Sequence, residues 1–403
     1  MPEPSILVAG AGPVGVVTAL AFAQRGFRVT LLEAADAVDQ NPRASTTHPS
    51  TLEMIERVGL LDRFVAEGLV ARRFQFWDRP AGRCIAEFDH AVLEGETRFP
   101  FVVQTEQHKL AAMGLDALRA LPNATVRFGA PVYAVTQDAD GVTVILGGKA
   151  AGETLRADWL VGADGGRSTV RKQLGIAFDG FTWPERFLVL TVLDDFEAMM
   201  GTCFRNYFAD PDEWANLFKV AGDDGLGRWR AVFPARVDES DEEALSDAAA
   251  MARLNGLHRK PDGYALVHRN LYKVHQRVAA SFRSGRVFLA GDAAHVNNPI
   301  GGLGLNFGIH DAMDLVDTLC GVVLDGADPA LLDGYERRRR TLNIEFVQAQ
   351  TVDNKKRLEE KDPAQRQQRL DELAAIAADP ARHKAFLLRT SLIGSVRQAA
   401  TMV

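Results

Sequence analysis

Cysteine is scarce in this sequence, and long apolar runs are missing from it. The 403 residues include only Cys84, Cys203 and Cys320, none in a CxxC spacing, which argues against a disulfide framework and against a cysteine-based zinc site. No run reaches the roughly 18 uninterrupted apolar residues of a membrane span, and no basic segment precedes the first apolar run. We therefore expect a cytoplasmic protein with no membrane partner and no bound metal.

An excess of positive charge is also missing. The formal net charge is −7 at pH 7, so electrostatics give no reason to expect nucleic acid or an anionic membrane as a partner. With 47% hydrophobic and 25% charged residues, the composition is that of an ordinary globular protein. The length predicts two or three packed regions.

The first apolar run, residues 5–34, has the features of a dinucleotide-binding unit. Its sequence, SILVAGAGPVGVVTALAFAQRGFRVTLLEA, predicts a strand, a glycine turn, a helix and a second strand. Gly10, Gly12 and Gly15 stand at GxGxxG spacing, which permits the sharp turn, the approach of a pyrophosphate, and close packing of helix on strand. Glu33 ends the second strand, where an acid can accept hydrogen bonds from a ribose diol.

Two more apolar strands end in glycine-rich segments. RADWLVGADGGRSTVRKQLG (156–175) reaches Asp164 at the end of its strand, and GRVFLAGDAAHVNNPIGGLGLNFGIHDA (285–312) reaches Asp292 in the same way. Between the first and second units, residues 124–148 alternate with a period of two and predict a β-meander. Two distant glycine-rich strand ends indicate that separate segments close over one extended ligand, although the second segment could also be a simple turn.

Together these three segments resemble, in order and approximate separation, the flavin motifs of single-component FAD-dependent aromatic hydroxylases, the para-hydroxybenzoate hydroxylase and phenol hydroxylase group. The resemblance covers roughly residues 5 to 345. It implies an α/β fold with a Rossmann-like FAD-binding domain that includes a β-meander, a β-sheet substrate domain, and C-terminal helices. The expected boundaries are 1–179 and 281–345 for the FAD-binding domain, 180–280 for the substrate-binding domain and 346–403 for the helical region.

The resemblance also implies which residues bind noncovalent FAD. Asp292 would accept a hydrogen bond from the ribityl chain, and the start of the helix near Gly304 would point at the pyrimidine edge of the ring. Arg43 reads locally as a surface arginine, but the resemblance places it near the ribityl and pyrophosphate groups, and it places Pro299 beside the reactive face of the ring. Arg43 and Pro299 are therefore the candidate catalytic groups. The expected FAD-binding residues are Gly10, Gly12, Gly15, Glu33, Arg43, Gln104, Asp164, Asp292, Gly304, Leu305 and Asn306.

Other positions leave alternatives open. His295 could be a base, but we interpret it as packing or hydrogen bonding within its turn, and the base stays unassigned. Leu303 departs from the glutamine that relatives often have there, so no role is carried over to it. Ser50 and Glu53 in STLE predict a capping box at a helix start. The run from Glu336 to Arg340 predicts a solvated helix face, with phosphate binding as the alternative.

The substrate pocket is expected on one predicted strand, TCFRNYF (202–208). Alternation places Arg205 and Tyr207 on one face and Phe204 and Phe208 on the other. We expect Arg205 and Tyr207, with Pro299, to contact the substrate, and the alternative is that they lie on the surface of an edge strand.

The implied activity is that of an NAD(P)H- and O2-dependent FAD monooxygenase. It would hydroxylate a small phenolic or heteroaromatic substrate through a flavin C4a-hydroperoxide. No second GxGxxG unit follows a strand, so NADH or NADPH is expected to bind transiently, to a monomer or a homodimer. The alternatives are a halogenase or oxidase of the same fold, or a non-catalytic flavin-binding protein. The halogenase needs a WxWxIP segment, and RWRAVFP (228–234) does not match it. The substrate and the choice of NADH or NADPH stay open.

Overall fold

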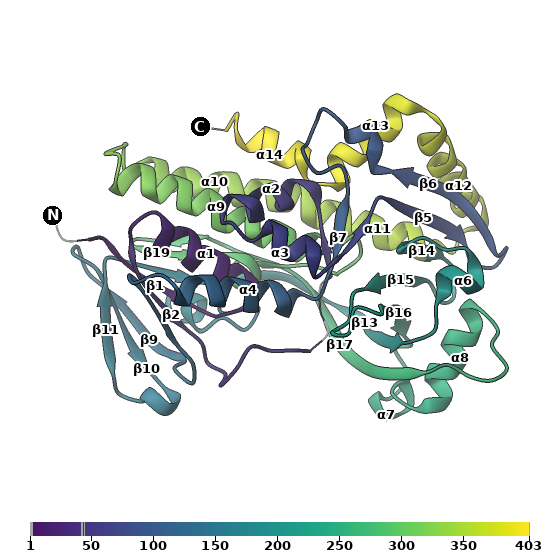
Figure 1. The fold of residues 1–403 in the computed structure, drawn as a ribbon, viewed down its shortest axis with the longest axis horizontal. Coiled ribbons are helices and arrows are strands. Elements are labelled where there is room, and N and C mark those ends of the chain that lie inside the picture. The colour runs from purple at the N-terminus through teal and green to yellow at the C-terminus, as the bar shows by residue number, and fades with distance from the viewer. Residues whose placement is uncertain (1–2, 42, 44, 403) are drawn as a thin grey trace.

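The computed structural model of the chain describes residues 3–41, 43 and 45–402. Its described strands form two large sheets and two small ones. Figure 1 shows the first large sheet with its helices on one side of the molecule and the second on the other, with the C-terminal helices above the second. This mixed α/β architecture confirms the predicted fold class.

The first large sheet brings the three glycine-rich segments together. It has six strands in the order β18-β19-β12-β1-β2-β8. The strands β1, β12 and β19 run parallel and lie next to one another, and each of them precedes one of the three motifs. Because the carboxyl ends of adjacent parallel strands meet at one edge of a sheet, the three motifs converge there. The bounds are β1 Ser5–Ala9, β2 Arg28–Leu32, β8 Ala124–Arg127, β12 Trp159–Gly162, β18 Arg283–Ser284 and β19 Val287–Leu289.

Helix α1 is buried between this sheet and two other helices. Residues 15 to 23 of α1 are all buried, because the helix contacts the sheet on one side and α4 and α9 on others. This explains why its sequence is apolar on every face rather than along one stripe. The helices of this part are α1 Pro13–Gln24, α2 Pro49–Arg57, α3 Leu61–Ala66, α4 Gln107–Arg119, α5 Thr169–Gln173, α9 Leu303–Val323 and α10 Leu331–Leu342.

Two small sheets flank the first large one. The predicted meander is present as the antiparallel strands β9 Val132–Gln137, β10 Val142–Leu146 and β11 Thr154–Ala157. The beginning of the segment predicted as meander forms β8 instead, which pairs with β2 in the large sheet. The other small sheet joins β3 Thr46–Thr47, β4 Leu69–Ala71 and β7 Val102–Gln104.

The second large sheet has eight strands in the order β20-β17-β13-β16-β15-β14-β5-β6. Its central strands come from the segment predicted as the substrate-binding sheet, but β5, β6 and β20 come from outside residues 180–280. Strand β14 lies between β15 and β5, so it is not an edge strand. The bounds are β5 Arg73–Asp78, β6 Arg83–Asp89, β13 Phe178–Val192, β14 Arg205–Ala209, β15 Ala215–Val220, β16 Arg228–Ala235, β17 Leu266–Ala279 and β20 His295–Val296.

Helices cover both faces of this second sheet. The helices α6 Phe196–Met200, α7 Asp241–Ala244 and α8 Asp247–Leu257 lie at one face (Figure 1). The C-terminal helices, predicted from the sequence, lie at the other: α11 Ala349–Glu359, α12 Pro363–Ala378, α13 Pro380–Thr390 and α14 Ile393–Ala399. Leu358, Leu370 and Leu387 of these helices share a hydrophobic cluster with Phe74 and Tyr207 of the sheet. No helix in the described part of the chain is long and apolar enough to cross a membrane.

The arginine-rich end of α10 is not the solvated face predicted from the sequence. Arg339 is 2% exposed, and its Nε donates to Asp311 Oδ1 at 2.8 Å. Arg340 Nε donates to the carbonyl oxygen of Ala279 at 3.0 Å. The prediction is wrong for Arg339 and Arg340, because α10 packs against α9 and close to the end of β17, whereas Arg337 is exposed as predicted.

Candidate active site

The glycine turn after β1 is shaped to admit a ligand at one position only. Gly10 has φ 103°, and a Cβ there would lie 2.3 Å from the Ala163 carbonyl oxygen. A Cβ on Gly15 would lie 1.9 Å from the Gly10 carbonyl oxygen. A Cβ on Gly12 would meet no atom of another part of the described chain within 4 Å. Gly10 and Gly15 are therefore required by packing, whereas Gly12 borders open space at the amino end of α1, where unpaired N–H groups attract a phosphate.

Glu33 is held at the side of this turn. Its carboxylate accepts hydrogen bonds from Ala11 N at 2.6 Å and from Ala35 N at 2.8 Å. Two carboxylate oxygens offer about four acceptor positions. Glu33 therefore keeps acceptor capacity for the hydroxyl groups of a ribose while the backbone fixes its orientation.

The second and third motifs are connected by Arg171. Its Nη1 donates to the Ala293 carbonyl oxygen at 2.7 Å, and its Nη2 donates to the Gly166 carbonyl oxygen at 2.8 Å. Asp164 accepts hydrogen bonds from Thr169 N at 2.7 Å and Val170 N at 3.1 Å, the first two N–H groups of α5, beside the N-cap residue Ser168. The structure thus gives Asp164 a local role, beside the role in nucleotide binding that the resemblance implies.

A buried network supports the turn that carries Asp292. His295 is fully buried, and its Nε2 lies 2.6 Å from Asp311 Oδ2, which also accepts from Gly291 N at 3.0 Å. This supports the interpretation of His295 as a packing and hydrogen-bonding residue. The side chain of Asp292 is exposed to solvent. Neighbouring protein atoms partly desolvate its carboxyl group and raise its pKa, and the charges of His295 and Arg43 oppose the shift.

Two other predicted flavin residues differ in their surroundings. Gln104 is fully buried; its Oε1 accepts from Thr46 Oγ1 at 2.6 Å, and its Nε2 has no partner among the described residues. A buried donor without an acceptor is costly, so this amide fits an oxygen of a bound flavin chain. The side chain of Arg43 is exposed, as its local sequence indicates, but it also pairs with Asp39 at 3.1 Å, which the sequence did not predict. Its charge acts on Asp292 as well.

The third motif ends in a loop that leads into α9. The helix begins at Leu303, after Gly302 with φ 70°. Asn306 is fully buried; its Oδ1 accepts from His48 N at 2.8 Å, and its Nδ2 donates to the Thr46 carbonyl oxygen at 2.8 Å. This side chain therefore joins the start of α9 to the segment before α2. The backbone N–H groups of Gly304 and Leu305 belong to the first turn, where a helix leaves them unpaired and its positive end favours negative charge.

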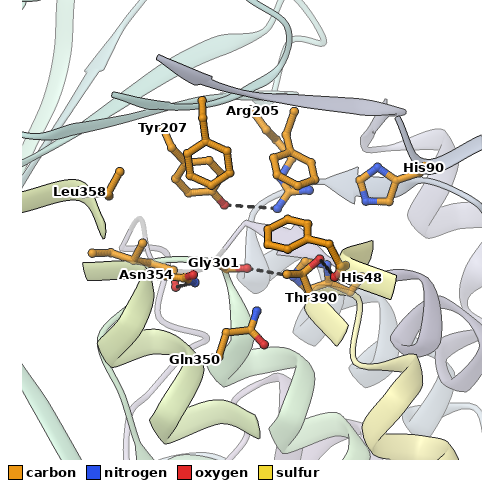
Figure 2. A pocket seen from close by; sticks show the side chains of 13 residues that line it. His48, His90, Arg205, Tyr207, Gly301, Gln350, Asn354, Leu358 and Thr390 are labelled. Atoms are coloured by element: carbon orange, nitrogen blue, oxygen red, sulfur yellow. Dashed lines mark hydrogen bonds between the residues drawn. The ribbon is translucent and has the colours of Figure 1, made fainter. Parts of the chain in front are cut away.

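Beside this loop lies a cavity between β14 and the C-terminal helices (Figure 2). Its volume is about 30 Å³, enough for on the order of two water molecules, so side chains have to move to admit an aromatic ring. Arg205 and Tyr207, which alternation placed toward the substrate, both line it, and Phe208 packs in the core on the opposite face. The lining residues are His48, Phe74, Phe76, His90, Arg205, Tyr207, Ile300, Gly301, Gln350, Asn354, Leu358, Phe386 and Thr390.

Arg205 is a buried cation in this cavity. It is 3% exposed, and none of the described carboxylates pairs with it. Its Nη2 donates to the Tyr207 hydroxyl oxygen at 3.3 Å, whereas its Nε and Nη1 have no hydrogen-bond partner in the described chain. A buried charge without a counter-ion costs several kcal/mol, so the cavity favours an anionic or strongly accepting ligand. Burial, followed by the charge of Arg205, lowers the pKa of His90 to about 3.

Sequence reasoning missed His48, His90 and Gln350, which lie on three segments remote from each other in the chain. The position of His48 also explains why the predicted capping box fails. Helix α2 begins at Pro49 after His48, so Ser50 lies inside the helix and its Oγ donates to the Ser391 carbonyl oxygen at 2.8 Å. No local pattern marks such residues, because only the packing of the C-terminal helices brings them together.

Comparison with known proteins agrees with this geometry. Residues 3–350 match the FAD binding domain family. The para-nitrophenol 4-monooxygenase of Pseudomonas sp. strain WBC-3 is 38% identical over 368 residues, which cover 90% of this chain and 89% of that protein. A 6-hydroxy-3-succinoylpyridine 3-monooxygenase of Pseudomonas putida is 35% identical, covering 89% and 90%. The crystal structure of a p-nitrophenol 4-monooxygenase of Pseudomonas putida superimposes with a TM-score of 0.90 at 36% identity, covering 96% of this chain and 97% of that one.

Proposed function

The chain belongs to the family of FAD-dependent aromatic monooxygenases, and from this premise we propose that it hydroxylates a small hydroxyaromatic compound at a substituted ring carbon para to the hydroxyl group. The enzyme class, its FAD cofactor and a phenolic or heteroaromatic substrate follow from the family. The position of attack and the residues involved are the proposal.

The names of two relatives support the position of attack. The para-nitrophenol 4-monooxygenase is named for oxygen insertion at position 4 of its substrate, the carbon that carries the nitro group. The 6-hydroxy-3-succinoylpyridine 3-monooxygenase is named for insertion at position 3, the carbon that carries the succinoyl group. Both carbons lie opposite the ring carbon that bears the hydroxyl group. A hydroxyl group donates electron density to that position, which makes it the site of electrophilic oxygen transfer.

The observation that carries the proposal is the guanidinium of Arg205 in an aromatic cavity, where it has no counter-ion in the described chain and its Nε and Nη1 have no hydrogen-bond partner there. Two donors without partners fit an oxygen that holds negative charge, such as a phenolate or a nitro group. The rings of Phe74, Phe76 and Tyr207 offer flat apolar walls for an aromatic ring. A small phenol bearing an electron-withdrawing para substituent matches both features.

The residues of the chain would hold FAD and shield the reaction from water. When bound, FAD supplies electron transfer from NAD(P)H and the activation of O2. Gly12 and Glu33 would hold the nucleotide end and Gln104 the chain, while Pro299 and the start of α9 would flank the ring. The helices α11 and α13 would exclude solvent from the cavity.

A screen of substrates on the FAD-loaded enzyme tests this function. The compounds are para-nitrophenol, other 4-substituted phenols and 5-substituted 2-hydroxypyridines, each with NADH and with NADPH. We expect at least one to stimulate NAD(P)H oxidation with release of the para substituent. A nitro or halide group leaves with its electron pair as an anion, so the product detected by mass should be the para-quinone, or the para-dihydroxy compound once a second NAD(P)H has reduced it. A product that is hydroxylated ortho to the hydroxyl group, with its substituent retained, contradicts the proposed position. A lack of stimulation by every compound contradicts the substrate class.

A further inference from the structure

The cavity between β14 and the C-terminal helices contains an imidazole with one nitrogen that has no hydrogen-bond partner in the described chain. His48 is 2% exposed, and its Nε2 lies 2.9 Å from the Gly301 carbonyl oxygen. A carbonyl oxygen can only accept, so Nε2 carries the proton and donates it. The Nδ1 atom then carries a lone pair, and it is buried without a hydrogen-bond partner among the described residues.

His48 connects the cavity to the loop of the third motif. Its backbone N donates to Asn306 Oδ1 at 2.8 Å, and it precedes the first residue of α2, so the main chain is fixed on both sides. Gly301, which accepts from the ring, belongs to the loop that enters α9. Figure 2 shows the ring beside Gly301, with Arg205 and Tyr207 on the other side of the cavity. The imidazole is therefore held where a substrate would lie next to that loop.

Burial keeps the ring of His48 neutral, and three charged or titratable groups face it. They are Arg205 from β14, His90 from the short helix η1 (His90–Leu93) and His310 from α9. Burial, and after it the charge of Arg205, lowers the pKa of His48 well below 6.5, although the Gly301 carbonyl opposes this. A neutral imidazole with its proton on Nε2 is a hydrogen-bond acceptor at Nδ1. An anion paired with Arg205 would neutralise the charge that lowers the pKa of His48, and the imidazole would become more basic.

We propose that His48 Nδ1 accepts the hydrogen bond of the substrate hydroxyl group and takes its proton, while Arg205 stabilises the negative charge that forms. The substrate O–H bond breaks and an N–H bond forms on Nδ1, so a neutral phenol and a neutral imidazole become a phenolate and an imidazolium, with no change in oxidation state. The phenolate is more electron-rich at its para carbon than the phenol. This inference rests on the proposed function, because it assumes a hydroxyaromatic substrate in this cavity.

The test measures the ionisation of bound para-nitrophenol on the oxidised, FAD-loaded enzyme without NAD(P)H. The visible absorption of this probe distinguishes phenol from phenolate, and the pH is set about one unit below the pKa of the free probe. His48→Gln keeps an amide donor for the Gly301 carbonyl but lacks Nδ1. His90→Gln is the matched control, because His90 lines the same cavity and its Nδ1 also bonds a carbonyl oxygen, that of Arg72 at 2.9 Å.

We expect phenolate in the wild-type and His90→Gln complexes and neutral phenol in the His48→Gln complex. The pKa of the bound probe should rise by about one unit or more in His48→Gln, a tenfold change in the ionisation constant. His48→Asn serves as a second variant, and FAD content and the thermal midpoint verify that each variant folds.

Three results overturn the inference. They are phenolate bound to His48→Gln as in the wild type, neutral phenol bound to the wild type, or loss of ionisation in His90→Gln alone. No turnover occurs in this assay, so its result is separate from the proposed function. An ortho product with a phenolate complex contradicts only the position of attack, whereas a para product with a neutral-phenol complex contradicts only the role of His48.

Discussion

Replacing Gly12 by valine should separate cofactor binding from folding. A side chain at Gly12 points into space that no other described part of the chain fills, and its φ of −67° suits any residue. The apoprotein should therefore lose less than about 1 kcal/mol of stability, the usual effect of an unfavourable helix N-cap residue. A bound pyrophosphate, however, would meet the valine. Hydrogen bonds to a charged group contribute about 1.5 to 3 kcal/mol each. Losing two of them weakens FAD binding by about 3 to 6 kcal/mol, or roughly a hundred- to ten-thousandfold.

Gly15→Ala is the matched control within the same turn. Its added Cβ would lie 1.9 Å from the Gly10 carbonyl oxygen, so the backbone has to shift, and we expect the apoprotein to lose about 1 to 3 kcal/mol. Urea unfolding of both apoproteins gives their stability, and titration with FAD followed by flavin fluorescence gives affinity. A Gly12→Val protein that retains wild-type FAD affinity would show that the nucleotide does not lie on this turn. A Gly12→Val apoprotein as unstable as Gly15→Ala would refute the argument from open space.

Three more predictions follow from the same structure. Asp292→Ala should weaken FAD binding by about 1.5 to 3 kcal/mol, or roughly ten- to a hundredfold, because a ribityl hydroxyl loses its charged acceptor; equal dissociation constants in a titration of apoprotein would exclude the contact. Tyr207→Phe removes the hydroxyl that accepts from Arg205 and so loosens the position of the substrate; the variant should bind FAD normally but release more H2O2 per NAD(P)H oxidised. Phe208→Ala on the opposite face should instead lose about 3 to 5 kcal/mol of stability. A tightly coupled Tyr207→Phe enzyme together with a stable but uncoupled Phe208→Ala enzyme would mean that the pocket lies on the other face of β14. The free energy of unfolding should fall as the pH falls from about 6.5 toward 3, because His90 binds a proton in the unfolded chain but stays neutral when buried. Urea unfolding at pH 7 and pH 4.5 should show a smaller loss of stability for His90→Gln than for the wild type, and an equal loss would refute this assignment.

Local patterns were sufficient to predict the nucleotide-binding half of the molecule. The spacing of Gly10, Gly12 and Gly15 depends on contacts within one strand–turn–helix unit, and the structure shows that unit with Gly10 and Gly15 in tight contact. The strands before Asp164 and Asp292 were recognisable because each is a short apolar run that ends in glycines. Alternation along β14 placed Arg205 and Tyr207 on one face for the same reason, since side chains on a strand alternate between faces whatever surrounds it.

Only the tertiary structure decided which of these faces is a cavity and what lines it. His48 precedes the first residue of α2, Arg205 lies on β14 and Gln350 lies on α11. All three line the cavity, and no spacing in the sequence relates them. The partners of the arginines were equally unpredictable: Arg339 pairs with a buried carboxylate on α9, whereas Arg205 has no carboxylate partner in the described chain. Burial and charge pairing depend on which elements pack together, and those contacts form between residues that are far apart in the chain.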